Sequence, residues 1–218
     1  MKMLPVDPVK PDPNVLAEAA KIINAGGLVA FPTETVYGIG ADGTNQSAIR
    51  KIYQVKGREK RKPILVIVGK EKDIIPLTQF VPAGVENIID AFWPGPLTLI
   101  FPAAKNVAPD LLGQGSTIGI RYTSSVLSRE LCRVAGCPIT APSANLSGCH
   151  EPLSAEDVAK QIGDKVDLIL DGGASFSKEP STVVDVSGDR PILVRAGGIS
   201  FSDIMEIWDQ TAEFKHKG

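Results

Sequence analysis

A concentrated block of positive charge runs from Arg50 to Lys62, shortly after a hydroxyl-rich turn at Phe31–Gly38. The block holds seven basic residues and one acid, Glu59, so it carries +6, whereas the whole chain carries −2. Crowding like charges costs stability through self-repulsion, and such crowding often serves a phosphate-bearing ligand. The same pattern is equally typical of a solvated helix face. Charge alone leaves both interpretations open.

Smaller polar clusters recur at the ends of predicted strands, where ligands bind in open α/β sheets. Thr117 and Arg121 lie on one predicted strand, whose alternation points both side chains to the same face. The other clusters are Pro142–Asn145, Ser181–Thr182 and Arg195. Turn chemistry or surface exposure explains each cluster alone. Together their hydroxyl, amide and guanidinium groups suit phosphate, ribose and carboxylate oxygens.

Two familiar nucleotide-binding motifs are not supported. Gly38, Gly40 and Gly43 have the spacing of a dinucleotide-binding fingerprint, but Pro32 interrupts the preceding strand and the downstream acidic residue is replaced by the basic block. A P-loop would need a glycine five residues before Gly69–Lys70, and that position is isoleucine. Any nucleotide must therefore be bound in another way.

The elements that position these residues follow an α/β pattern, because short apolar runs alternate with amphipathic segments. Helices are predicted at 13–25, 45–55, 84–92, 125–135, 155–162 and 202–208. Strands are predicted at 28–31, 64–68, 97–101, 117–121, 138–140, 168–170, 182–186 and 192–195. We expect an N-terminal extension over residues 1–12, one main domain over 13–210 and a tail over 211–218. The turn-rich segment 103–115 is predicted to be a mobile loop over a site.

The composition argues against a disulfide-stabilised, a zinc-binding or a membrane-spanning protein. A chain of 218 residues can bury a large core without disulfides, and its three cysteines are an odd number. The Cys132–Cys137 spacing matches no zinc pattern and the chain has only two histidines, so no metal site made by the protein alone is expected. The sequence indicates reduced thiols in a cytoplasm, with no apolar stretch long enough to span a membrane.

Five ordered motifs carry a resemblance to a known family. They are Phe31–Gly40, Lys56–Arg58 with Lys62–Pro63, Trp93–Thr98, Ser143–Gly148 and Ser181–Asp185. With these motifs the chain resembles the YrdC-like threonylcarbamoyl-AMP synthases over roughly residues 13 to 200. The resemblance implies a twisted, open, mixed sheet flanked by helices, with a concave and positively charged cavity. It also implies that L-threonine, bicarbonate and ATP give threonylcarbamoyl-AMP and pyrophosphate.

The resemblance also implies roles for individual residues. Catalytic roles fall to Lys56 and Arg58. The residues expected to bind ATP are Arg58, Lys62, Thr117, Ser143, Asn145 and Arg195. Those expected to bind threonine are Thr35, Arg121 and Ser181. Mg²⁺ is expected as a cofactor held mainly by the ATP phosphates and water, with the nearby Glu34 not counted as a ligand.

The expected partners extend beyond the three substrates. A separate tRNA threonylcarbamoyl transferase would accept the product, and the group would end on an adenosine beside the anticodon. Ile67 stands where many relatives carry histidine, and Tyr122–Ser124 replaces a proline and histidine, so the threonine pocket is expected to differ. Because about 20 residues follow Arg195, the chain resembles the single-domain form of the family.

Two alternatives stay open at this level. One is a YrdC-like RNA-binding paralogue without synthase activity, whose basic concavity would hold RNA phosphates. Weak RNA binding is possible on charge, but only Tyr53 among the aromatic residues interleaves with the basic block, and its helical spacing buries it. The other alternative is a paralogue with a changed amino-acid substrate, which the Ile67 departure permits.

Overall fold

The computed structural model describes residues 2–175, 177 and 179–215. The strands are β1 (Lys2–Pro5), β2 (Val29–Phe31), β3 (Gly38–Gly40), β4 (Val66–Ile67), β5 (Leu97–Pro102), β6 (Thr117–Arg121), β7 (Ile139–Thr140), β8 (Leu168–Asp171), β9 (Thr182–Asp185) and β10 (Ile192–Arg195). The α-helices are α1 (Pro13–Asn24), α2 (Gln46–Lys56), α3 (Val85–Phe92), α4 (Pro109–Leu112), α5 (Val126–Ala135), α6 (Ala155–Ile162) and α7 (Phe201–Lys215). Two 3₁₀ segments, η1 (Glu71–Leu77) and η2 (Gly163–Lys165), complete the described elements. The predicted α/β class is confirmed.

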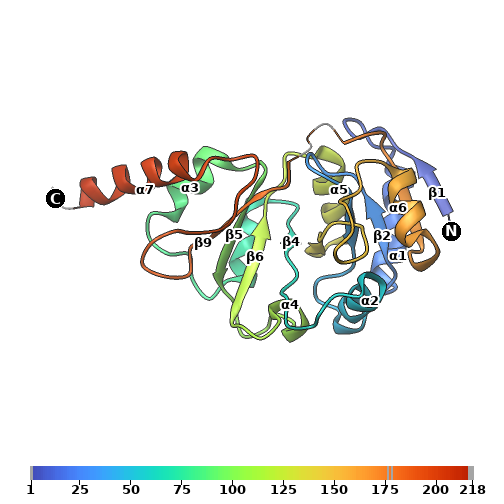
Figure 1. The fold of residues 1–218 in the computed structure, drawn as a ribbon, viewed down its shortest axis with the longest axis horizontal. Coiled ribbons are helices and arrows are strands. Elements are labelled where there is room, and N and C mark those ends of the chain that lie inside the picture. The colour runs from blue at the N-terminus through green and yellow to red at the C-terminus, as the bar shows by residue number, and fades with distance from the viewer. Residues whose placement is uncertain (1, 176, 178, 216–218) are drawn as a thin grey trace.

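The smaller sheet has the strand order β1-β8-β2-β3, with β8 parallel to both β1 and β2 and with β3 antiparallel to β2. Its central strands are apolar on both faces. Val29 and Phe31 pack with α1 and α5, whereas Ala30 belongs to the core that includes α6. Helices therefore cover both faces, as the uninterrupted apolar run of β2 requires (Figure 1).

The larger sheet has the strand order β10-β9-β5-β6-β4-β7 and mixes parallel with antiparallel pairs. Helices α3 and α7 lie together at its far end (Figure 1). The two sheets join where β3 meets β7, through bridges that pair Asp42 with Ile139 and Gly38 with Ser143. Hence the mixed open sheet expected from the sequence consists of two sheets linked by short strands.

Local sequence explains how α2 begins and ends. The Asn45 side chain caps its first turn by accepting hydrogen bonds from the backbone N–H groups of Ser47 and Ala48. At the other end Gly57 adopts a left-handed conformation, with φ 58°, and the Arg58 N–H bonds back to the Tyr53 carbonyl at 3.0 Å. This ending turns the chain sharply and directs Arg58 away from the helix axis.

Some elements depart from the expected boundaries. Within the predicted extension 1–12, β1 forms the edge of the smaller sheet and Val6 N–H bonds to the Asp171 carbonyl at 2.8 Å, so this segment packs as part of the domain. Helix α7 continues to Lys215, past the expected boundary at residue 210, and residues 216–218 of the expected tail lie outside the described ones. No helix in the described part of the chain is long and apolar enough to cross a membrane.

Segment 103–115 was predicted to be a mobile loop over a site, and in the structure it is packed against α2 instead. It contains α4, which packs against α2, and its Leu111 is buried. Tyr53 donates its hydroxyl hydrogen bond to the Asp110 carbonyl at 2.9 Å, and the side chain of Asp110 pairs with Arg50. The apolar Leu111 and these polar contacts hold the segment on the outside of α2, a placement that turn composition alone did not indicate.

Candidate active site

A cavity of about 290 Å³ opens where the two sheets meet. One wall comes from strands β5, β6, β9 and β10, and the other from the turn after β2 and the loop after β7. Seven of the residues predicted for the site line it: Thr35, Arg58, Thr117, Arg121, Ser143, Ser181 and Arg195. The separate clusters of the sequence are therefore neighbours in space.

Strand periodicity accounts for the β6 part of the wall. Thr117, Gly119 and Arg121 all line the cavity, while the intervening Ile118 and Ile120 are fully buried in the core. This is the alternation expected of a strand with one face toward the cavity. The prediction that Thr117 and Arg121 share a face is confirmed.

Arg121 is the most tightly held cation of the cavity, with 5% of its surface exposed. Its Nη2 lies 2.8 Å from Glu34 Oε1, its Nη1 donates to Thr35 Oγ1 at 3.2 Å, and its Nε donates to the Gly95 carbonyl at 3.2 Å. A carboxylate and a hydroxyl from the turn after β2 thus fix the guanidinium before any ligand binds.

Glu34 is held from the other side as well. The Thr123 hydroxyl donates to one carboxylate oxygen, and the Ser124 N–H donates to the other at 2.9 Å. Burial by itself would raise the pKa of the Glu34 carboxyl, but the charge of Arg121 and these hydrogen bonds outweigh burial and lower that pKa. Glu34 therefore stays ionised and engaged, which leaves it poorly placed to hold a metal ion.

Arg58 and Arg195 present further positive charge to the cavity. Arg58 Nη2 donates to the Pro63 carbonyl at 2.8 Å, and Arg195 Nη2 donates to the Ser181 carbonyl at 2.8 Å and to Ser181 Oγ at 3.0 Å. Desolvation is the main cause that lowers the pKa of both guanidinium groups, and the positive charges of Arg121 and Arg58 lower the pKa of Arg195 further, against the opposite effect of Glu151. Ordinary arginine pKa values are so high that both remain charged near neutral pH. An anionic ligand would relieve this repulsion.

Lys56 and Asn145 do not line the cavity but hold the loop that does. Lys56 is 3% exposed, and its Nζ donates to the carbonyls of Ser143 and Asn145 and, at 3.1 Å, to Asn145 Oδ1. An ammonium group has three donors, so this lysine has none left for a ligand. Desolvation chiefly, with the charge of Arg58, lowers the pKa of Lys56 to about 8.

Lys62 lies at the surface. Its side chain is 55% exposed and pairs with Glu59 at 3.2 Å, while the neighbouring Arg61 pairs with the same carboxylate. Lys62 is not among the residues that line the cavity. Of the seven basic residues in the block, Arg58 alone does so among the described residues.

Other cavity residues were not predicted from the sequence. Thr98 lines the wall, its hydroxyl lies 3.0 Å from Ser181 Oγ, and it falls within the Trp93–Thr98 motif, so strand alternation from that motif could have identified it. Glu151 also lines the cavity, but it stands in an irregular segment with no periodicity to mark it. Glu34 was considered only as a metal ligand, and its pairing with Arg121 was missed.

Metal-ligating groups are sparse in the described residues, where no cluster of three or more His, Cys, Asp or Glu side chains could hold a metal ion. Glu151 is one carboxylate facing a cavity whose other charged groups are arginines. Among the described residues the cavity therefore offers a metal ion a single carboxylate as a protein ligand.

Comparisons with known proteins agree on one family. A model of the Sua5/YciO/YrdC family, described as telomere recombination, matches residues 21–197. Threonylcarbamoyl-AMP synthase of Bacillus subtilis is 40% identical over 194 residues, covering 88% of this chain and 56% of that protein. A putative threonylcarbamoyl-AMP synthase of Mycobacterium tuberculosis is 38% identical over 192 residues, covering 88% of each chain.

Solved structures show the same relationship. The crystal structure of Pyrococcus abyssi Sua5 complexed with L-threonine is 34% identical, with a TM-score of 0.92, and the match covers 95% of this chain and 61% of that one. The chain thus spans little more than half the length of its Bacillus relative, and about three fifths of the Pyrococcus structure. Since the family model and the relatives both match most of the chain, the protein belongs to the Sua5/YciO/YrdC family.

Proposed function

We propose that this protein is an L-threonylcarbamoyladenylate synthase, a nucleotidyltransferase that makes threonylcarbamoyl-AMP and pyrophosphate from L-threonine, bicarbonate and ATP. The observation that carries the proposal is a single cavity lined by three arginines and several hydroxyl groups, which suit the carboxylate of threonine and the phosphates of ATP. Arg121 adjoins the Thr35 hydroxyl, Arg195 adjoins Ser181, and Arg58 and Ser143 also line the cavity. Relatives with this activity in their names, and a homologue bound to L-threonine, support the same assignment.

The reaction needs no covalent enzyme nucleophile. The amine of threonine and bicarbonate give a carbamate and water, and a carbamate oxygen then attacks the α-phosphorus of ATP. The bond from that phosphorus to the bridging oxygen breaks, and pyrophosphate leaves with its electron pair. Positioning and charge neutralisation are the contributions required of the protein. Arginines around a cavity supply both.

On the amino-acid side, Arg121 would face the threonine carboxylate while Thr35 and Ser181 accept from its ammonium group. The Glu34 ion pair already fixes the guanidinium at 2.8 Å, so little side-chain freedom would be lost when threonine binds. Ile67 is fully buried in the core between β4 and α5, so it would act on this pocket only through packing.

On the nucleotide side, Arg58 and Arg195 would neutralise the phosphates, with Thr117 and Ser143 as hydroxyl partners. Lys56 and Asn145 would act by holding Ser143 in place, because their polar atoms already bind that loop. Lys62 would attract the triphosphate from the rim. When bound with ATP, Mg²⁺ would supply further neutralisation of the phosphate charge.

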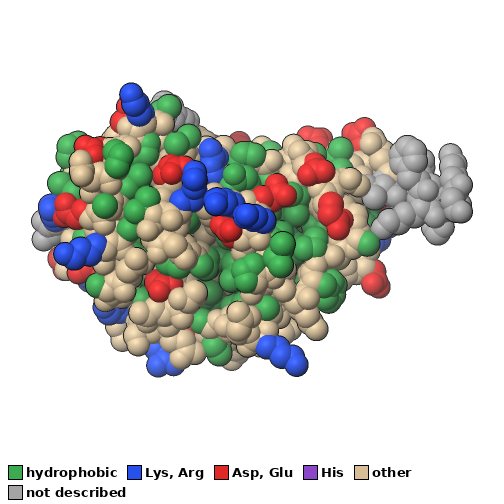
Figure 2. All heavy atoms as spheres, turned by 180° about the vertical axis from the view of Figure 1, so that it is seen from behind, with side chains coloured by type: hydrophobic (Ala, Val, Ile, Leu, Met, Phe, Trp, Pro, Cys, Tyr) green, Lys and Arg blue, Asp and Glu red, His purple; other side chains and the backbone are tan. Residues whose placement is uncertain are grey.

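The product would pass to a tRNA threonylcarbamoyl transferase and end on adenosine beside the anticodon, in a cytoplasm. The face drawn in Figure 2 intersperses Lys and Arg with Asp and Glu side chains, rather than gathering positive charge over a wide area. This face therefore offers no wide basic surface for an RNA backbone.

The test is pyrophosphate release from ATP by the purified protein. We expect release that depends on both L-threonine and bicarbonate, and a product of the mass of threonylcarbamoyl-AMP. Omitting either co-substrate is the internal control. Absence of release, combined with RNA binding of steep salt dependence, would instead establish the RNA-binding paralogue.

A further inference from the structure

Two hydroxyl groups of the cavity differ in what they can offer a ligand. Thr35 lies in the turn after β2, Ser181 directly precedes β9, and both side chains line the cavity. A hydroxyl has one hydrogen to donate and two lone pairs that accept. The protein groups that already bond to each hydroxyl therefore determine whether it can still donate to a ligand or only accept from it.

The single hydroxyl hydrogen of Thr33 is used within the turn itself. Thr33 Oγ1 donates to the Val36 carbonyl at 2.7 Å, and a carbonyl oxygen can only accept. The same Oγ1 accepts from the Thr35 N–H at 3.1 Å, as in the turns that threonine forms with the backbone two residues further on. Toward any other hydroxyl, Thr33 can therefore act only as an acceptor.

The bond from Thr33 to Val36 fixes the direction of the Thr35 hydroxyl. The two threonine Oγ1 atoms lie 2.9 Å apart, and Thr35 must be the donor because the hydrogen of Thr33 is already used. Arg121 Nη1 donates to Thr35 Oγ1 at 3.2 Å, since a guanidinium cannot accept. Within the described part of the chain these two bonds are those of the Thr35 hydroxyl. One lone pair then remains, so Thr35 can only accept from a ligand.

The turn that carries both threonines is held in place. The Ser128 hydroxyl on α5 donates to the Pro32 carbonyl at 3.0 Å, directly before Thr33. Thr35 is 3% exposed. Turning its hydrogen toward a ligand would break the bond to Thr33 where little water could replace it, which is costly for a buried polar group.

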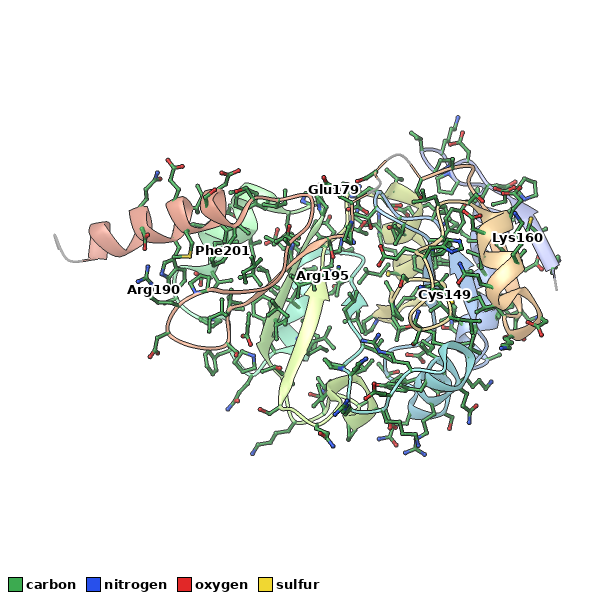
Figure 3. The ribbon with its side chains drawn as sticks, in the orientation of Figure 1. Cys149, Lys160, Glu179, Arg190, Arg195 and Phe201 are labelled. Atoms are coloured by element: carbon green, nitrogen blue, oxygen red, sulfur yellow. The ribbon has the colours of Figure 1, made fainter. Side chains whose placement is uncertain are left out.

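The Ser181 hydroxyl is less restricted. Arg195, labelled in Figure 3, comes from β10 of the larger sheet, and its Nη2 donates to Ser181 Oγ at 3.0 Å. Thr98 Oγ1 also lies 3.0 Å from Ser181 Oγ, and either of these two hydroxyls can be the donor. Ser181 can therefore adapt to a donor or to an acceptor, whereas Thr35 cannot.

A hydroxyl that only accepts discriminates between the two ends of an amino acid. The ammonium group of threonine donates hydrogen bonds, whereas its carboxylate oxygens accept them. A carboxylate at Thr35 would face a lone pair, while the neighbouring Arg121 has the donors that a carboxylate needs. Resting on the proposed function, we propose that Thr33 is a positioning residue. It keeps the Thr35 hydroxyl an acceptor and so orients the amino acid with its amine toward Thr35 and its carboxylate toward Arg121.

The experiment measures equilibrium binding of L-2-aminobutanoate and 2-oxobutanoate by calorimetry. These acids differ only at carbon 2, where the first carries a donating ammonium group and the second an accepting carbonyl oxygen. Wild type should bind the amino acid at least roughly tenfold more tightly, the size of a hydrogen bond that involves a charged group. Thr33→Val should lower this ratio roughly threefold or more, because the Thr35 hydrogen becomes free to meet the carbonyl. Thr33→Ser keeps a hydroxyl and should retain the ratio.

Three further variants complete the design. Thr44→Val is the matched control, since it removes an exposed hydroxyl that bonds to Asp42 outside the cavity, and both affinities should stay unchanged. Thr35→Val keeps the bond from Thr33 to Val36 but removes the acceptor, so it should weaken binding of L-2-aminobutanoate roughly tenfold. The double variant with Thr33→Val should match Thr35→Val alone, because Thr33 acts through Thr35.

Several results would overturn the inference. An unchanged ratio in Thr33→Val, or in Thr35→Val should the first variant not fold, would show that these hydroxyls do not orient the ligand. Additive losses in the double variant would mean that Thr33, which also lines the cavity, contacts the ligand itself. Equal weakening of both acids in Thr33→Val would leave Thr33 a structural role only. A wild type that binds L-threonine but shows no preference between the four-carbon acids refutes this inference alone. A wild type that neither binds L-threonine nor releases pyrophosphate refutes the proposed function as well.

Discussion

The fold holds two basic regions of the molecule, strand β6 and the loop after α2, with different firmness. Arg121 on β6 is buried, paired with Glu34 and bonded to Thr35, whereas the loop after α2 carries Lys60, Arg61 and Lys62 at the surface. The loop supplies the stronger sequence signal, yet Arg58 is the member that reaches the cavity among the described residues. A high density of charge along the chain therefore indicates only the region of a site. The alternation of a strand indicates which individual side chains face the cavity.

The largest effect on stability should come from breaking the buried ion pair of Arg121 and Glu34. Arg121→Ala leaves the Glu34 carboxylate partly buried without its cation, which should lower the free energy of unfolding by about 3–5 kcal/mol. Urea denaturation measures this loss of unfolding free energy. In steady-state kinetics, the KM for threonine should also rise more than the KM for ATP.

The surface pair of Arg133 and Glu130, 2.8 Å apart, is the control for that variant. Its side chains are 50% and 35% exposed, so Arg133→Ala should cost less than about 1 kcal/mol. Combining Arg121→Ala with Glu34→Gln should recover part of the loss, because the second change removes the stranded charge. If Arg121→Ala costs no more than Arg133→Ala, the contrast between the two regions is mistaken.

Arg58→Ala tests the other region through activity. If Arg58 neutralises the phosphates as proposed, its removal should slow adenylate formation by about 100-fold or more, in the range of a lost transition-state donor. Stability should change by less than about 1 kcal/mol, because Arg58 is only partly buried and bonds to carbonyls of its own loop. Turnover at the wild-type rate would remove Arg58 from the phosphate site.

Lys56 and Lys62 allow the stability contributions of a buried and an exposed lysine to be compared. Lys56→Met strands the buried carbonyls of Ser143 and Asn145 and should cost about 2 kcal/mol, measured by urea denaturation. Lys62→Met removes only an exposed pair with Glu59 and should stay within about 0.5 kcal/mol. Equal costs would show that burial of the Lys56 ammonium does not matter to the fold.

The smallest expected effect is the change in stability that Glu34 causes when the pH is lowered. Because the pKa of Glu34 in the folded protein lies below the ordinary 4.5, this carboxyl stabilises the fold fully above that value. The stabilisation is lost as pH falls through the lower folded-state pKa. The difference in unfolding free energy between wild type and Glu34→Gln should shrink on acidification from about pH 7 to about pH 3, and a constant difference would contradict the pairing.

Sequence reasoning recovered most helices and strands because their periodicity and caps are local properties. Asn45, Ser125 and Asp12 cap the helices that the pattern predicted. It did not recover the division into two sheets, because β3, β4 and β7 are two or three residues long and depend on long-range pairing.

The sequence indicated which residues face the cavity where a side chain's direction follows from its backbone. Thr117 and Arg121 share a strand face, and both line the cavity. Lys56 was expected beside the phosphates, but a long flexible side chain can turn either way, and the carbonyls of the Ser143–Asn145 loop decide its direction. Glu151 carries no local pattern at all, so only the three-dimensional structure brings it to notice.

Strands β10 and β6, which form part of the cavity wall, should differ in how easily they open locally. It is an edge strand with a bulge between Leu193 and Arg195, and all four of its residues are exposed. Strand β6, by contrast, is paired on both sides, with β5 and β4. Local fraying costs least at such an edge. We expect amide hydrogens of β10 to exchange with solvent through brief local openings and those of β6 to exchange only on global unfolding, so opening the wall that carries Arg195 should cost less free energy than opening the wall that carries Arg121.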